Sequence, residues 1–209
     1  MKKYFLIFSL LVFSYISFSQ SYVEKFICSY SGNENLEMEI MINFNVENQR
    51  EILTRVYFIK NRYFLIKIEK PELFSGILYL YDLHEKDFLT KYDNEIDKYS
   101  EISLLTASIP SFINRVLLGF SPDKFIMTSE TIGSYFTEKY VPKTKNAMKL
   151  FNIDYTIYNF YFLKNDNYLY LKNIKILNST QKKEIDLSIN YIGRLDSEDA
   201  YKLINDFFE

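Results

Sequence analysis

The chain has 209 residues, a net charge of −2, 48% hydrophobic residues and a single cysteine. This length suffices for one domain with a hydrophobic core, and one cysteine excludes an intrachain disulfide. The small negative charge argues against nucleic acid as a partner, because binding to phosphates requires a surplus of lysine and arginine.

The first nineteen residues have the pattern of a secretory signal peptide. Two lysines precede the apolar run Tyr4–Ile16, and small residues then lead up to Ser19. The apolar run is shorter than the roughly 20 residues that a membrane-spanning helix needs. The pattern therefore predicts export to the periplasm, cleavage after Ser19 and a single mature domain over residues 20–209.

The beginning of the mature chain predicts a helix followed by a series of β-hairpins. Ser21–Tyr30 has its apolar residues near one helical face. In Met38–Val46 apolar and polar residues alternate, which is typical of a half-buried strand. Further strands, separated by turn-forming residues, are predicted over residues 52–59, 63–68, 77–81 and 88–92.

The middle of the chain breaks this pattern with a predicted helix. Pro110 fits the first turn of a helix, and Gly119 fits its C-terminal end. Between them, three- and four-residue spacings form one apolar stripe from Phe112, Ile113, Val116 and Leu117. A second helix is predicted to begin at Ser121-Pro122-Asp123 and to run to about Thr128.

Strands and a final helix complete the predicted fold. The strands are expected over residues 135–141, 150–158, 160–163, 168–176 and 185–191. Ser197 is the expected N-cap of the last helix, whose apolar side would consist of Tyr201, Ile204 and Phe208. Together these elements predict one α+β domain. Its curved antiparallel sheet of about ten strands forms an unclosed barrel, with helices against the concave face.

Few residues favour catalysis or metal binding. His84 lies in a polar turn, and Cys28 has no adjacent base of the kind that activates a nucleophile. Zinc sites need clustered cysteine and histidine, which this sequence lacks. Glu37, Glu39 and Asp186 occupy alternating strand positions and predict a solvated face. We therefore predict a protein without enzymatic activity, cofactor or metal, and a hydrolase that uses two carboxylates stays open as an alternative.

Four segments resemble the Lol-type periplasmic lipoprotein carriers and the lipoprotein-sorting proteins related to them. They are KNRYFLIKIEKPELFSGILYLYD (Lys60–Asp82), LHEKDFLTKYD (Leu83–Asp93), FINRVLLGFSPDKF (Phe112–Phe125) and FTEKYVPK (Phe136–Lys143). In the first segment Pro71 and then Gly76 separate two strands, as in the sorting branch. Lys70 stands where the carriers often have an arginine, and the chain lacks the tryptophans that they have in neighbouring strands.

The resemblance implies an unclosed antiparallel barrel with a helical lid, which carries acylated lipoproteins between the inner and outer membranes. The implied partners are an acylated lipoprotein or lipid, together with a membrane-bound donor and acceptor of the lipoprotein-sorting system. The acyl chains would lie in a hydrophobic cavity under the lid. Burial there supplies about 0.8 kcal/mol for each methylene, so that no catalytic group is required.

Strand alternation and the central apolar stripe together predict which residues would bind lipid. The lid would consist of Phe112, Ile113, Val116, Leu117 and Phe120. The wall would consist of Ile40, Ile42, Phe44, Val56, Phe58, Phe64, Ile66, Leu78, Leu80, Phe160, Phe162, Leu169 and Leu171. At the rim, Leu73 and Phe74 would lie between a strand end at Pro71 and a bend at Gly76. The alternative is the same fold with a filled core, which docks a partner protein and takes no lipid.

Overall fold

The computed structural model describes most of the chain after the predicted signal peptide. The described residues are 21–30, 35–45, 50–60, 62–85, 87–93, 95–98, 113, 116, 117, 120–144, 148–150, 153–165, 168–181 and 184–209. The predicted signal peptide and Pro110 therefore lie outside the described residues. No helix in these ranges is long and apolar enough to cross a membrane.

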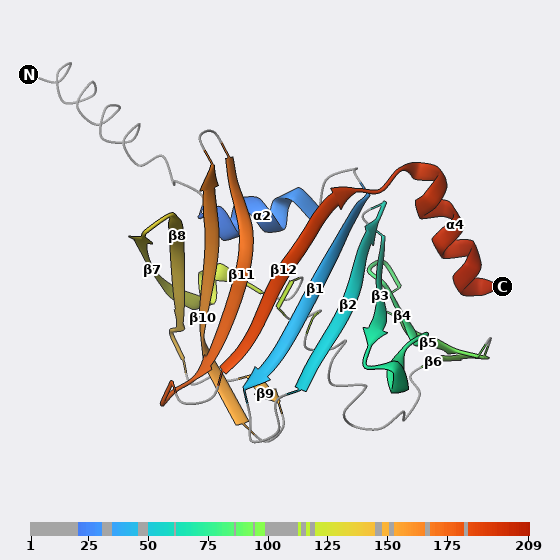
Figure 1. Cartoon of the computed structure of the whole chain (residues 1–209), viewed down its shortest axis with the longest axis horizontal. Helices are drawn as coiled ribbons and strands as arrows, with labels where there is room; N and C mark the ends of the chain where they lie inside the picture. Colours follow the sequence, from blue (N-terminus) through green and yellow to red (C-terminus); the bar gives the residue numbers. More distant parts are fainter. Residues whose placement is uncertain are drawn as a thin grey trace, which may run out of the picture.

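The described residues form a single antiparallel sheet of twelve strands (Figure 1). Its spatial order is β6-β5-β4-β3-β2-β1-β12-β11-β10-β8-β7, and the short strand β9 pairs with β10. The strands are β1 (Leu36–Asn45), β2 (Arg50–Ile59), β3 (Tyr63–Lys70), β4 (Leu78–Asp82), β5 (Phe88–Tyr92), β6 (Glu95–Lys98), β7 (Phe125–Ile132), β8 (Tyr135–Pro142), β9 (Met148–Leu150), β10 (Ile153–Asn165), β11 (Tyr168–Asn178) and β12 (Glu184–Arg194).

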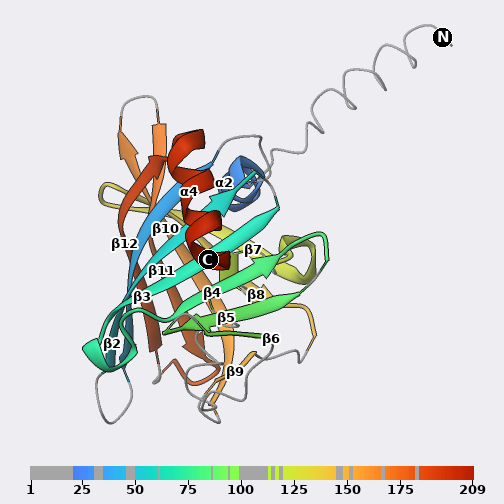
Figure 2. The same ribbon diagram turned by 90° about the vertical axis from the view of Figure 1, so that its right-hand side faces the viewer.

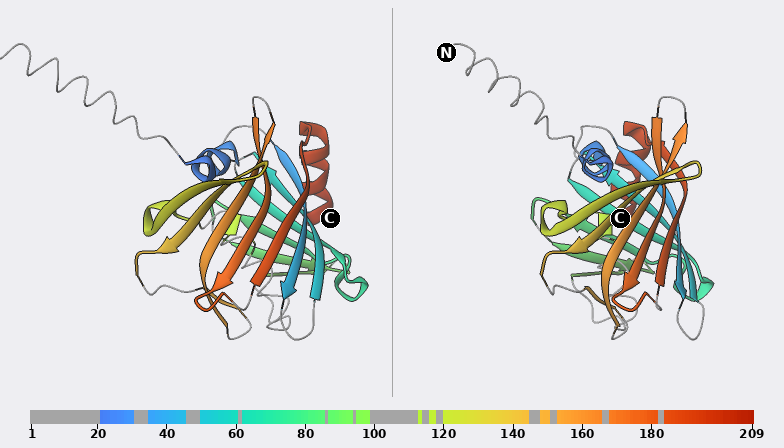
Figure 3. Two further views of the ribbon diagram at one scale, coloured as in Figure 1. Left: turned by 60° about the vertical axis from the view of Figure 1, so that its left-hand side comes forward. Right: turned by 90° about the vertical axis from the view of Figure 1, so that its left-hand side faces the viewer.

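The sheet curls but does not close, because the edge strands β6 and β7 are not paired with each other. Figure 3 shows the two halves of the sheet bending toward the same side. Buried side chains from both halves consequently meet in one cluster on the concave face. The predicted α+β class and the unclosed antiparallel barrel are confirmed.

The central strands follow the alternation in the sequence. In β1, Met38, Ile40, Ile42 and Phe44 are buried on the concave face, while Glu37 and Glu39 lie on the other face. Strand β1 joins the two halves because it pairs with β2 on one side and with β12 on the other.

The two long helices lie on different faces of the sheet. Helix α2 (Tyr22–Tyr30) packs Val23 into the concave cluster, as predicted. Helix α4 (Ser197–Phe208) lies instead across the convex face, in front of β3 and β4 in Figure 2. The expectation that all helices cover the concave face is therefore wrong for α4. The last four residues of β2 are buried on both faces because of α4: Val56 and Phe58 face inward, while Tyr57 and Ile59 face α4.

The details of α4 also correct the sequence prediction. Its N-cap is Asp196, whose carboxylate accepts hydrogen bonds from the backbone N–H of Glu198 and Asp199. Ser197 is already the first helical residue. Its buried side chains are Ala200 and Phe207, with Leu203 and Ile204 partly buried beside them. Tyr201 and Phe208 are exposed, because the helix is rotated relative to the expected apolar face.

Three strand predictions need correction as well. After Ser121 there is only a single 3-10 turn, η2 (Pro122–Lys124), and the chain then continues as strand β7. The residues Thr128, Thr131 and Ile132 are β-branched and favour this strand over the predicted helix. The two strands predicted over 150–158 and 160–163 are one long strand, β10, preceded by β9. Strand β6 was not predicted.

The turn between β3 and β4 has its proline and its glycine at the positions that the sequence predicts for a strand end and a bend. Pro71 follows the last residue of β3, and the 3-10 turn η1 (Glu72–Phe74) leads to Gly76. Gly76 has a φ of +91°, a conformation that residues with a Cβ rarely adopt. At the rim Leu73 is 81% exposed, while Phe74 packs against the concave cluster.

Candidate functional site

The concave face of the sheet carries a continuous apolar surface. It is lined by the buried residues of β1–β4, β8 and β10–β12, and it is covered by Val23 of α2 and by Ile113, Val116, Leu117 and Phe120. We call these residues together the concave cluster. Because one strand face from each half of the sheet contributes, only the curled sheet brings them together.

Most of the predicted lipid-binding residues meet in this cluster. The wall residues in it are Ile40, Ile42, Phe44, Val56, Phe58, Phe64, Ile66, Phe160, Phe162 and Leu171. The lid residues Ile113, Val116 and Leu117 are helical and almost completely buried, and Phe120 follows them into the cluster. Phe112 lies outside the described residues, as does the side chain of Leu169.

Two predicted wall residues lie elsewhere. Leu78 and Leu80 face α4 on the convex side, together with Leu65 and Phe207. Leu80 is paired with Leu65, and Tyr79 is paired with Ile66 of the concave face. Both faces of β4 are apolar, so that its alternation did not distinguish inside from outside. The residue that takes the inward position is Tyr79.

An aromatic group closes one side of the concave cluster. The ring of Phe120 stacks on Phe125 at a centroid distance of 4.9 Å, and it lies 5.1 Å from Tyr140 and 5.0 Å from Phe160. Tyr158 is 5.3 Å away. The position of Phe120 is therefore set by rings from β7, β8 and β10. Phe125, Tyr140 and Tyr158 were not among the predicted site residues. Tyr140 and Val141 are neighbours in one strand, so their side chains point to opposite faces of the sheet, and Val141 is the exposed one.

A buried carboxylate holds helix α2 in place over the concave face. Glu138 of β8 accepts hydrogen bonds from the backbone N–H of Tyr22 at 2.7 Å and of Val23 at 3.1 Å. These N–H groups belong to the first turn of α2 and have no acceptor within the helix. The hydroxyl of Tyr140 donates a third hydrogen bond to Glu138 at 2.8 Å. Burial raises the pKa of Tyr140, so that this phenol keeps its proton.

The start of α2 also contains a signal that a sequence reading can find. Ser21 and Glu24 form a capping box, in which the Ser21 hydroxyl accepts from the N–H of Glu24 and the Glu24 carboxylate accepts from the N–H of Ser21. The spacing Ser-x-x-Glu indicates this arrangement, whereas nothing local indicates Glu138. Helix α2 is thus held at its N-terminus from within and from β8.

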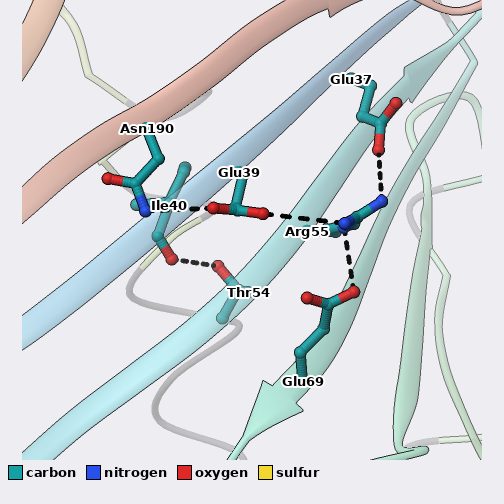
Figure 4. A network of polar contacts seen from close by, with 7 residues as sticks. All are labelled: Glu37, Glu39, Ile40, Thr54, Arg55, Glu69 and Asn190. Atoms are coloured by element: carbon teal, nitrogen blue, oxygen red, sulfur yellow. Dashed lines mark hydrogen bonds and ion pairs between the residues drawn. The ribbon is translucent and has the colours of Figure 1, made fainter.

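The convex face carries a cluster of oppositely charged side chains around one arginine. Arg55 of β2 contacts Glu37 at 3.1 Å, Glu39 at 3.7 Å and Glu69 at 2.9 Å (Figure 4). Glu39 also accepts a hydrogen bond from Asn190. Burial lowers the pKa of Arg55, but Glu69 and the neighbouring groups outweigh it and raise the pKa above its usual value. Of the carboxylates predicted to form a solvated face, Glu37 and Glu39 are therefore partners of Arg55, whereas Asp186 is a partner of Lys175.

The remaining polar residues do not form a reactive site in the described ranges. His84 lies exposed in the turn after β4, where its backbone N–H donates to Asp82. Lys175 of β11 bridges Glu184 and Asp186 on the convex face. No group of three or more His, Cys, Asp or Glu residues in the described parts of the chain is arranged to hold a metal ion.

No protein-family model and no curated protein matches the chain. The structure is similar to those of lipoprotein-sorting and LolA superfamily proteins. A lipoprotein-sorting protein domain from Vibrio parahaemolyticus is 12% identical, with a TM-score of 0.47 over 87% of this chain and 96% of that one. A LolA superfamily protein from Nitrosomonas europaea is 9% identical, with a TM-score of 0.45 over 81% of this chain and 92% of that one.

A third solved structure, of a DUF1329 family protein from Desulfovibrio piger, is 12% identical over 88% of this chain and 92% of that one, with a TM-score of 0.49. Identities and TM-scores of this size describe a similar strand arrangement and extend no ligand to this chain. What the protein binds has to be argued from its own residues.

Proposed function

We propose that the protein is a non-enzymatic periplasmic carrier, which binds the acyl chains of a lipoprotein against the concave face of its sheet. The observation that carries this proposal is the concave cluster, in which an apolar face of a curled sheet is covered by the apolar segment that ends at Phe120. Because both the sheet face and the segment that covers it are apolar, the ligand of this face would be apolar as well.

Acyl chains can replace the contacts that the central apolar segment makes with the sheet. Ile113, Val116 and Leu117 contact the sheet through apolar side chains, and acyl methylenes present the same chemistry to the wall. Each methylene moved from water supplies about 0.8 kcal/mol. A chain that enters between segment and wall therefore stabilises the complex, while the polar convex face stays in water.

The proposal extends to the surroundings of the protein. Cleavage after Ser19 would release residues 20–209 into the periplasm. A membrane-bound donor would deliver the acylated protein, and a membrane-bound acceptor would receive it. Transfer from the donor to the carrier and on to the acceptor would be driven by the differences in their affinities for the acylated protein.

Native mass spectrometry tests the proposal on protein purified from the periplasm without detergent. We expect an added mass that organic extraction removes, and uptake of a diacylated lipopeptide by the stripped protein. Leu117→Glu should abolish uptake because it places a carboxylate against the apolar wall. Leu73→Glu is the matched control, since Leu73 is exposed at the rim, and circular dichroism verifies that both variants are folded.

A second function is favoured by one specific observation. The side chains of Ile113, Val116 and Leu117 are no more than 2% exposed, which is also the arrangement expected of a filled core that docks a partner protein. A protein without added mass, which takes up no lipopeptide, would favour this second function. Uptake by Leu117→Glu equal to that of the natural protein would remove the central segment from the site.

A further inference from the structure

The two edges of the sheet are built differently. Strand β6 at one edge has four residues, and three of them, Glu95, Asp97 and Lys98, are charged. Strand β7 at the other edge has eight residues and a single charge, Glu130. Short charged edges discourage pairing with another chain, while long uncharged edges permit it. Only β6 has the features of a protected edge.

Strand β7 presents backbone groups that its neighbour β8 does not use. Phe125 is paired with Pro142, which has no N–H to donate. In the neighbouring pair, the N–H of Lys143 donates a hydrogen bond to the carbonyl of Lys124 at 3.0 Å. Along two antiparallel strands, residue pairs that exchange hydrogen bonds alternate with pairs that do not. The N–H and carbonyl groups of Met127, Ser129 and Thr131 therefore point away from β8, toward the edge with which no described strand pairs.

Strand β7 has an isoleucine three residues before Ser129 and another three residues after it. The segment Ile126–Ile132 reads IMTSETI. Antiparallel pairing of two such strands about Ser129 places Ile126 opposite the partner's Ile132, and Thr128 opposite the partner's Glu130. The two Glu130 side chains do not face each other, so that the register contains no pair of like charges.

This register would also join apolar side chains that are exposed in the single molecule. Ile126 is 57% exposed and Ile132 is 54% exposed, and within the hairpin they are paired with Val141 and Tyr135. In the paired molecules each row would run from Tyr135 through Ile132 to the partner's Ile126 and the partner's Val141. The central two residues would form a non-hydrogen-bonded pair, in which side chains are closest.

We propose that β7 is the interface for a second copy of this chain, and that the two copies pair antiparallel about Ser129 into one continuous sheet. The equal spacing of Ile126 and Ile132 from Ser129 favours a second copy, because a copy paired about Ser129 covers both exposed isoleucines with each other. The interface uses the edge of the sheet and leaves the concave cluster free. It is therefore independent of the proposed lipid binding.

Sedimentation equilibrium over a concentration series tests the interface on the processed protein. We expect the average mass to rise toward twice that of the monomer. Ser129→Pro should keep the protein monomeric, because it removes an outward N–H and no hydrogen bond to β8. Ser129→Ala retains the N–H and should dimerise like the natural protein. A natural protein that stays monomeric would overturn the proposal in favour of a strand from another protein, and a dimer of Ser129→Pro would place the interface elsewhere.

Disulfide cross-linking tests the register in a background that carries Cys28→Ser. Thr128→Cys and Glu130→Cys are opposite each other only between copies, so a mixture of the two variants should form a disulfide dimer on mild oxidation. Each variant alone should form little, because diagonal neighbours lie too far apart for a disulfide. Equal cross-linking by Thr128→Cys alone would overturn pairing about Ser129.

Discussion

At the scale of single residues, Glu138 shows how a charged side chain is accommodated inside an apolar cluster. Its two carboxylate oxygens accept from two backbone N–H groups and one phenol. A buried carboxylate is tolerated only with such partners. The same contacts orient α2, so that one residue of β8 sets the position of the cover over the concave face.

We expect Glu138→Ala to lower the free energy of unfolding by several kcal/mol. The substitution leaves the N–H groups of Tyr22 and Val23 and the hydroxyl of Tyr140 without their acceptor, and each unsatisfied buried group costs about 1–3 kcal/mol. Urea denaturation measures the change. The control is Glu130→Ala at an exposed position of β7, where about 0.5 kcal/mol or less is expected. Equal effects of the two substitutions would show that α2 does not depend on Glu138.

At the scale of elements, α4 covers part of the convex side of the sheet and has no part in the concave cluster. Phe207 and Ala200 of α4 pack against Leu65 and Leu80. Lys91 of β5 donates a hydrogen bond to the carbonyl of Asp206 at 2.6 Å, which satisfies a carbonyl in the last turn of the helix. The helix is thus tied to the half of the sheet that ends at β6.

Adjacent phenylalanines in α4 provide a matched pair of substitutions. Phe207 is fully buried and Phe208 is 52% exposed. We expect Phe207→Ala to cost about 3–5 kcal/mol of unfolding free energy, because it removes a ring from a packed cluster and leaves a cavity. Phe208→Ala should cost far less. Thermal or urea unfolding measures both, and comparable losses would mean that α4 packs in a different rotation. Lipopeptide uptake should be unchanged in Phe208→Ala.

The elements differ in how far the sequence predicts them. The alternation in β1 has charged residues on one face, so it predicts both the strand and its buried face. Strand β4 is apolar on both faces because α4 covers its outside, and the inward position of Tyr79 depends on that remote contact. The first half of strand β7, up to about Thr128, was predicted to be helical from Pro122 and Asp123, but the β-branched residues of β7 and its pairing with β8 decide the outcome.

At the scale of the whole molecule, the curl of the sheet separates an apolar concave side from a convex side that is polar outside the part covered by α4. Charged groups such as Arg55 and Lys175 lie on the convex side, where their carboxylate partners are also placed. The concave side collects residues that are more than a hundred positions apart in the chain, from Val23 to Ile189. This separation explains why the wall could be predicted strand by strand, while the aromatic group around Phe120 required the complete topology.

The absence of tryptophan from the chain allows a direct test of where a ligand lies. A single tryptophan introduced by Phe120→Trp reports from the concave cluster, and one introduced by Tyr201→Trp reports from α4, where Tyr201 is 62% exposed. We expect a lipopeptide with brominated acyl chains to quench the fluorescence of the first variant and not of the second, because bromine quenches only at short range. Circular dichroism verifies that both variants are folded. Equal quenching would indicate adsorption to the surface, and quenching of Tyr201→Trp alone would move the binding site to the convex face.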